Sequence, residues 1–240
     1  MLTPNGISSI LFDLDGTLRH NRPSYFQSFF NFAVQAGAAD SVENRLRATR
    51  WLHYYWAQSA ELLADIEEFG RLDELFWTNH ARRSLGAFGC SPEEAEALAP
   101  RVYHLFSNNY SPEDWIPDDV IHTLETLQNA GFSMGVLSNR TYPFREHMGN
   151  WGLERFFELA LAAGELNTYK PEPEIFLYAV EKMGKKPGET LYVGDNYYAD
   201  VIGAQRAGLP VILLDPEGVF PDAECPVIKV INDLIEHLEK

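Results

Sequence analysis

Polar residues that can take part in phosphoryl transfer follow short apolar runs at four places in this 240-residue chain. Each run has the length and composition of a buried parallel strand. The carboxyl ends of such strands meet at one edge of a sheet, so we expect these side chains to lie close together. In chain order they are Asp13 and Asp15 after ISSILF, Ser138 and Asn139 after FSMGVL, Lys170 in the loop after LALAAG, and Asp195 after TLYVG.

The residue types match what phosphoryl transfer requires. The reaction needs a nucleophile, neutralisation of the phosphoryl oxygens, a proton donor for the leaving group, and alignment. A carboxylate can serve as the nucleophile. Carboxylates that share one site repel each other unless a cation lies among them, and oxygen ligands of this kind suit Mg²⁺. Lys170 and the hydroxyl of Ser138 could hold the phosphoryl oxygens, and Gly16 lets the backbone turn so that amide groups point into the site.

Strand and helix patterns alternate from Pro117 onward. Apolar residues recur at helical spacing in DDVIHTLETLQNAG, PEIFLYAVEKMG and ADVIGAQRAG, and short apolar runs lie between these segments. Such alternation predicts right-handed βαβ units around a parallel sheet. We therefore predict an α/β fold with a doubly wound parallel-sheet core.

Residues 22–112 have a different pattern, in which apolar and aromatic residues recur at helical spacing and no strand is evident. Ser91 and Pro92 mark a helix start, since Ser is a preferred cap and Pro fits the first helical position. We predict an all-helical insert at 22–112 within a core formed by 1–21 and 113–240. The aromatic run Trp51–Trp56 is expected to pack inside the insert, and contact with an organic leaving group is the alternative.

The motifs together resemble those of the haloacid dehalogenase-like (HAD) hydrolases, in the phosphatase branch whose helical cap is inserted after the first motif. All four motifs occur in the family's order at predicted strand ends, and the first is highly specific. They are DLDGTL from Asp13, Ser138-Asn139, Lys170 followed by PEP, and Gly194-Asp195 with Asp200. The resemblance spans nearly the whole chain and implies a Rossmann-like catalytic core with the insert as its cap.

The resemblance also implies how the motif residues act on a phosphate ester. Asp13 attacks phosphorus and forms an aspartyl-phosphate. Asp15 protonates the leaving oxygen and then activates water. Ser138, Asn139 and Lys170 bind the phosphate, and Lys170 also neutralises Asp13.

A Mg²⁺ ion is the cofactor that the resemblance implies. Its ligands are Asp13, the backbone carbonyl of Asp15, and Asp195. Asp200 holds this site in position, and a role as a helix cap is the alternative.

Composition restricts the partners. The formal net charge of −16 opposes binding to nucleic acid or an anionic membrane, so we expect a small phosphorylated metabolite as the substrate. Cys90 and Cys225 form no metal or redox motif, and the first residues lack a signal-peptide pattern, which fits a cytoplasmic protein. We expect a monomer or a small homo-oligomer.

Three other functions remain alternatives. A hydrolytic dehalogenase is disfavoured because dehalogenases that resemble this core lack an acid at the position of Asp15. A sugar phosphomutase would use the same nucleophile and acid but return the phosphoryl group to the sugar. A phospho-acceptor switch also uses Asp, Mg²⁺, a hydroxyl group and Lys, but its domain is about half this length.

Overall fold

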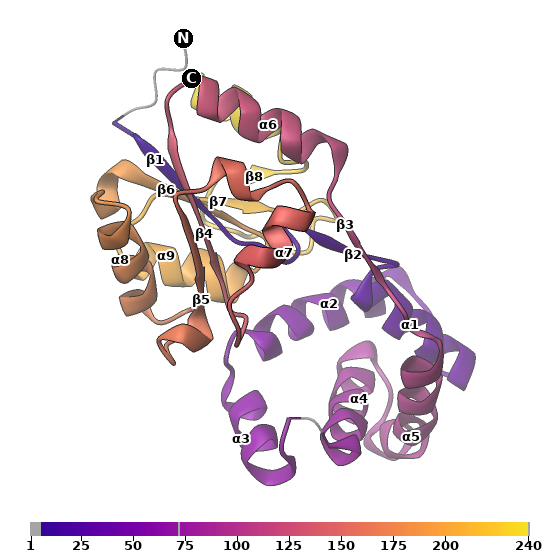
Figure 1. Ribbon diagram of the computed structural model, residues 1–240. Helices are drawn as coiled ribbons and strands as arrows, with labels where there is room; N and C mark the ends of the chain where they lie inside the picture. The colour runs from indigo at the N-terminus through magenta and orange to yellow at the C-terminus, as the bar shows by residue number, and fades with distance from the viewer. Residues whose placement is uncertain (1–5, 72, 240) are drawn as a thin grey trace. The chain divides into compact units, whose positions relative to one another are not determined.

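The computed structural model describes residues 6–71 and 73–239, and the chain divides into two compact units (Figure 1). The sheet unit runs to His20 and resumes at Trp115, and the insert is Asn21–Asp114. The predicted helical segment, 22–112, lies within the insert. None of the helices among the described residues is long and apolar enough to cross a membrane.

A six-stranded parallel sheet forms the centre of the sheet unit, in the order β5-β4-β1-β6-β7-β8. The first strand in the chain, β1, therefore lies between β4 and β6. The predicted α/β fold with a doubly wound parallel sheet is confirmed. The strands are β1 (Ser9–Phe12), β4 (Ser133–Ser138), β5 (Leu159–Ala162), β6 (Thr190–Gly194), β7 (Val211–Leu214) and β8 (Val227–Ile228).

The central strands are mostly apolar because both faces of the sheet are covered. Successive side chains of a strand point to opposite faces. Ile10 and Phe12 of β1 belong to one buried cluster, whereas Leu11 between them is also fully buried but lies outside it. The apolar run that precedes Asp13 thus fixes β1 between two layers.

Helices supply those two layers. Three of them contribute residues to the cluster that contains Ile10: α6 (Asp118–Asn129), α7 (Arg145–Asn150) and α10 (Asp233–Leu238). On the other side of the sheet from α6 (Figure 1), α8 packs with α9 and contacts β4 and β5. These two helices are α8 (Pro173–Lys182) and α9 (Ile202–Arg206).

The described residues of the insert form five helices, and side-chain caps define where four of them begin. The caps are Ser41, Ser59, Asp73 and Ser91, and Ser91 forms a reciprocal capping box with Glu94. Each cap satisfies a backbone N–H that has no partner within the helix. The helices are α1 (Tyr25–Ala36), α2 (Val42–Trp56), α3 (Ala60–Phe69), α4 (Glu74–Phe88) and α5 (Pro92–Asn109).

Four short elements among the described residues were not predicted from the sequence. The strands β2 (His20–Arg22) and β3 (Glu113–Trp115) pair as a separate two-stranded sheet where the chain passes between the units. β8 and α10 are also additional. Segments of two to six residues contain too few positions to display a period. The described residues also form 3₁₀ turns at Glu154–Phe156, Ala163–Glu165 and Pro187–Glu189.

Candidate active site

Asp13 lies directly after β1, at the carboxyl edge of the sheet. Its backbone N–H donates to the carbonyl of Val193 at 2.8 Å, which continues the pairing of β1 with β6. Because β4 and β6 flank β1, the residues that end or follow those strands reach the same edge. Ser138 ends β4, and Asp195 follows β6.

Lys170 makes the central contacts of the site. Its ammonium nitrogen Nζ donates to Asp13 Oδ1 at 2.5 Å, to Asp200 Oδ1 at 2.6 Å and to the hydroxyl of Tyr192 at 2.9 Å. The side chain is only 3% exposed. Burial alone would lower the pKa of Lys170, but the charges of Asp13 and Asp200 outweigh burial and raise that pKa. Lys170 therefore stays positively charged beside Asp13.

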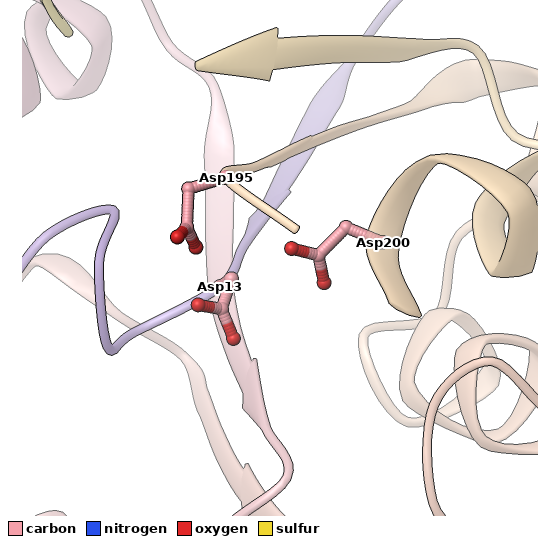
Figure 2. A group of neighbouring side chains, drawn as sticks. All are labelled: Asp13, Asp195 and Asp200. Carbon is pink, nitrogen blue, oxygen red and sulfur yellow. The ribbon is translucent and has the colours of Figure 1, made fainter. Parts of the chain in front are cut away.

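Three carboxylates converge on this edge: Asp13, Asp195 and Asp200 point toward one another in Figure 2. One oxygen from each lies within 4.8 Å of the others, a spacing that could hold a metal ion. Asp195 also accepts a hydrogen bond from Thr17 Oγ1 at 3.3 Å. A Cβ at Gly16 would lie 2.3 Å from Asp195 Oδ2, so the loop approaches Asp195 this closely only with glycine there.

The electrostatics of the cluster favour a divalent cation. Burial raises the pKa of Asp13 to about 7; Lys170 opposes this shift and the charge of Asp200 adds to it. Burial, followed by the charges of Asp13 and Asp200, raises the pKa of Asp195 well above its usual range. Three carboxylates against one ammonium leave excess negative charge in a buried place, and a bound cation would relieve it.

Asp200 has a more restricted position than the other two acids. Its Oδ1 accepts from Lys170 and from the Tyr192 hydroxyl at 3.0 Å, and its Oδ2 accepts from the backbone N–H of Asn196 at 2.9 Å. It lies on a π-helical turn, Tyr197–Val201, that precedes α9. With both oxygens hydrogen-bonded to protein groups, Asp200 is well suited to hold Lys170 and the Asp195 loop in place.

The two residues of the second motif, Ser138 and Asn139, lie in different environments. Ser138 is buried at the end of β4, and its Oγ accepts from the backbone N–H of Arg140 at 3.3 Å. Asn139 bonds to the backbone of Lys170 twice: its Nδ2 donates to the carbonyl at 2.9 Å, and its Oδ1 accepts from the N–H at 2.8 Å. Asn139 thus fixes the loop that carries Lys170.

Asp15 makes contacts that were not foreseen from the sequence. Arg140 donates to both of its carboxylate oxygens, from Nε at 2.7 Å and from NH2 at 2.8 Å. Arg19 adds a third contact at 3.1 Å. The available signals were the position of Arg140 directly after Ser138-Asn139 and the four-residue spacing of Arg19 from Asp15.

The structure brings together most of the predicted site residues. Asp13, Lys170, Asp195 and Asp200 lie in one cluster, in which Asp195 is half-buried and the others are buried, with Ser138 at the end of the adjacent strand. Asn139 joins the cluster through the backbone of Lys170, while the side chain of Asp15 is bound to arginines. Figure 2 shows the three acids of this site, and the hydrogen bonds of Lys170 to Asp13 and Asp200 join the lysine to them.

The expected packing of the aromatic run in the insert is observed for Tyr55. Its ring is fully buried and stacks on Trp51 with the ring centroids 4.9 Å apart. Its hydroxyl donates to Asp65 at 3.0 Å. Tyr55 thus belongs to the interior of the insert.

Known proteins similar to this chain include both phosphatases and dehalogenases. It is 30% identical to the glyceraldehyde 3-phosphate phosphatase of Methanopyrus kandleri, over 91% of this chain and 88% of that protein. It is 29% identical to (S)-2-haloacid dehalogenase 4A of Burkholderia cepacia, over 74% of this chain and 80% of that protein.

A solved structure supports the same fold. A predicted phosphoglycolate phosphatase from Haemophilus somnus aligns with a TM-score of 0.59 at 20% identity, covering 97% of this chain and 98% of that one. A family model described as haloacid dehalogenase-like hydrolase matches residues 7–208. The resemblance drawn from the four motifs is confirmed, and the chain belongs to the haloacid dehalogenase-like hydrolases.

Proposed function

We propose that the protein is a metal-dependent phosphatase that hydrolyses a small phosphate monoester through an aspartyl-phosphate at Asp13. The observation that carries this proposal is the contact of Lys170 Nζ with Asp13 at 2.5 Å, within a cluster of carboxylates at the strand ends. A buried lysine that served only to form an ion pair would need a single carboxylate as its partner. The excess of acids suits a site that binds a cation and a phosphoryl group together.

In the first step, a carboxylate oxygen of Asp13 attacks phosphorus. A bond forms between that oxygen and phosphorus while the bond from phosphorus to the ester oxygen breaks. Asp15 gives a proton to the leaving oxygen, which departs as an alcohol. Lys170 and Ser138 hold the phosphoryl oxygens, and Asn139 acts through the loop of Lys170.

In the second step, water attacks the phosphorus of the aspartyl-phosphate. Asp15 accepts the proton of this water, and the bond from phosphorus to Asp13 breaks. Inorganic phosphate leaves, and both carboxyl groups return to their initial protonation states.

Asp13, Asp195 and the backbone carbonyl of Asp15 are the groups that would hold Mg²⁺. The carboxylate oxygens are hard ligands, and the three carboxylates around one ammonium leave negative charge that a cation would stabilise. When bound, the ion supplies positive charge to the phosphoryl oxygens. Asp200 is less available because hydrogen bonds from Lys170, Tyr192 and Asn196 occupy its oxygens.

The choice of phosphatase over dehalogenase depends on Asp15. Dehalogenation needs no proton donor for a halide, whereas an alkoxide leaving group does. Relatives of both kinds exist at similar identity, so identity alone does not decide between the two activities.

The insert is proposed to act as a cap that selects the ester. The groups assigned to chemistry all belong to the sheet unit, while the insert is helical and rich in aromatic residues. In this role it admits the substrate and then excludes bulk water.

A panel of phosphorylated metabolites tests the proposed function. Phosphate release with Mg²⁺, and its loss in excess chelator, is the expected result. A parallel assay measures halide release from 2-haloacids with and without metal. Halide release together with no phosphate release from any ester would overturn the assignment. Transfer of the phosphoryl group back to a sugar phosphate, with no release of free phosphate, would indicate a mutase.

A further inference from the structure

Arg140 is held in place beside Asp15, the proposed acid–base residue, by contacts at both its backbone and its side chain. Its N–H donates to Ser138 Oγ, and its carbonyl accepts from the N–H of Gly164 at 3.1 Å. Its guanidinium carbon lies 5.8 Å from the ring centroid of Phe144 and 5.6 Å from that of Trp151. Aromatic faces attract a guanidinium and restrict its motion, so the group is oriented in advance.

The carboxylate of Asp15 occupies the donor fork of this guanidinium. Both of its oxygens are bound, and Arg19 contacts it as well. The side chain of Asp15 is nevertheless 37% exposed. This geometry is the one in which arginine recognises any carboxylate or phosphate.

Two guanidinium groups share one carboxylate at this position. Asp15, Arg19 and Arg140 carry one negative and two positive charges, whereas the chain has a net charge of −16. A second anion that reaches this group therefore meets two guanidinium groups that a single carboxylate neutralises only in part.

The contacts of Asp15 also conflict with its proposed work. A proton donor and acceptor must direct an oxygen at the ester oxygen and then at water, but both oxygens are bound to guanidinium groups. An event that transfers Arg140 to another oxyanion would release the carboxylate.

We infer that Arg140, assisted by Arg19, binds a second anionic group of the substrate, and that this exchange releases Asp15 for the reaction. The inference rests on the proposed phosphatase function and narrows the substrate to phosphate monoesters that carry a further carboxylate or phosphate. Arg140 is thereby a specificity-determining residue. Because the exchange couples binding to chemistry, the second anion raises kcat as well as lowering KM.

Three esters with the same carbon chain test this inference: propyl phosphate, its ω-carboxylate and its ω-phosphate analogue. For the wild type we expect kcat/KM to be about 10–100-fold higher for one or both of the esters that carry a second anionic group than for propyl phosphate. This factor corresponds to the free energy of a charge-assisted hydrogen-bonded pair. The ester with the larger advantage identifies whether the second group is a carboxylate or a phosphate.

Substitutions of Arg140 then remove the preference. In Arg140→Ala the ratio of kcat/KM between the favoured ester and propyl phosphate falls to near one, and Arg140→Lys, which keeps the charge but loses the fork, retains part of it. The matched control is Arg155→Ala. Arg155 also pairs with a carboxylate, Glu125 at 2.7 Å, and lies over a ring, Phe156 at 4.6 Å, but outside the site. In Arg155→Ala we expect the ratio of kcat/KM between the favoured ester and propyl phosphate to stay at the wild-type value.

The outcomes separate the inference from the function on which it rests. If the wild type hydrolyses all three esters at similar kcat/KM, or if Arg140→Ala lowers all three equally, Arg140 only positions Asp15 and the inference is wrong while the phosphatase stands. If no ester is hydrolysed, both fail. Circular dichroism of each variant establishes whether it is folded. If Arg140→Ala is not folded, Arg140→Lys is used to measure the ratio of kcat/KM between the esters.

Discussion

The two units contain buried charge in opposite arrangements. In the sheet unit, Asp13, Asp195 and Asp200 surround one lysine, and the acids outnumber the base. In the insert, Asp65 is 2% exposed and pairs with a single arginine, Arg83, at 2.8 Å. One arrangement is unbalanced and the other is neutral.

We interpret this difference as one between charge that serves binding and charge that serves folding. An unbalanced cluster costs stability, because each buried carboxylate repels the others. The neutral pair in the insert is completed by the hydroxyl of Tyr55, so its removal would leave a buried group without a partner. We therefore expect substitutions in the cluster to affect activity and substitutions in the pair to affect stability.

The largest effect is expected for Asp13→Asn. An amide is not a competent nucleophile here, so phosphatase activity should fall by on the order of 10⁴-fold or more. Colorimetric phosphate release measures the loss. Near wild-type rates would contradict the covalent mechanism.

The same substitution should not reduce stability when no divalent cation is present. The pKa of Asp13 is raised to about 7, above its usual value of 3.8. The folded state therefore binds this proton more tightly than the unfolded state, and the stability it contributes is lost as pH rises from about 4 through 7. Above pH 7 the free energy of unfolding of Asp13→Asn in chelator should equal or exceed that of the wild type, as measured by urea denaturation.

Asp65→Ala should have the opposite profile. It leaves Arg83 and the Tyr55 hydroxyl without their acceptor, at a cost of about 2–4 kcal/mol; Arg83 is 30% exposed, which reduces the cost below that of a fully buried pair. Turnover of an aryl phosphate per folded molecule should be retained. Glu154→Ala, which removes an exposed pair with Arg145 at 3.4 Å, is the control and should cost less than about 0.5 kcal/mol. Equal stability losses in the two variants would remove the distinction between the units.

Asp195→Asn should weaken the stabilisation of the fold by Mg²⁺. A ligand that binds only the folded state at about 100 times its Kd adds about 2.7 kcal/mol. We expect Mg²⁺ to raise the Tm of the wild type and to raise that of Asp195→Asn much less. The measurement is a thermal melt over a Mg²⁺ series, with Ca²⁺ for comparison. An identical shift in the two proteins would exclude Asp195 as a ligand.

The last comparison concerns the pH dependence of stability and His80 in the insert. Burial lowers the pKa of His80 to about 3, far below its usual 6.5. Between pH 6.5 and 3 the unfolded state binds a proton that the folded state does not, so stability falls as pH falls. His80 alone contributes a slope of about 1.4 kcal/mol per pH unit between pH 6 and 4. His80→Phe should show a shallower acid slope in urea denaturation; an unchanged slope would mean that His80 is protonated in the folded state.

The sequence was sufficient to predict the sheet and the positions of the motifs at its edge. Apolar runs identify buried strands, and the order of strands in a doubly wound sheet brings Asp13, Ser138 and Asp195 together by topology alone. Lys170 was found by its place in the motif order, since a lone lysine has no distinguishing local pattern.

Contacts between distant side chains could not be predicted in the same way. The pairing of Arg140 with Asp15 joins residues 125 positions apart, and no periodicity encodes it. The two hydrogen bonds of Asn139 with Lys170 depend on a loop path that the sequence does not specify. His80 lies among rings from several helices, including Tyr55 at 5.0 Å between centroids, and its isolation from water follows only from that packing.

Trapping the covalent intermediate is the most direct test of the proposed mechanism. Asp15→Ala mixed with an aryl phosphate and Mg²⁺ should release one leaving group per active site and then turn over slowly, because the aryl group needs little protonation while the second step still needs an activated water. Intact-mass spectrometry of the quenched protein should show one added phosphoryl group, and peptide mapping should locate it at Asp13. Continued turnover with no phosphorylated protein at any time, or a phosphoryl group on another residue, would contradict the proposed mechanism.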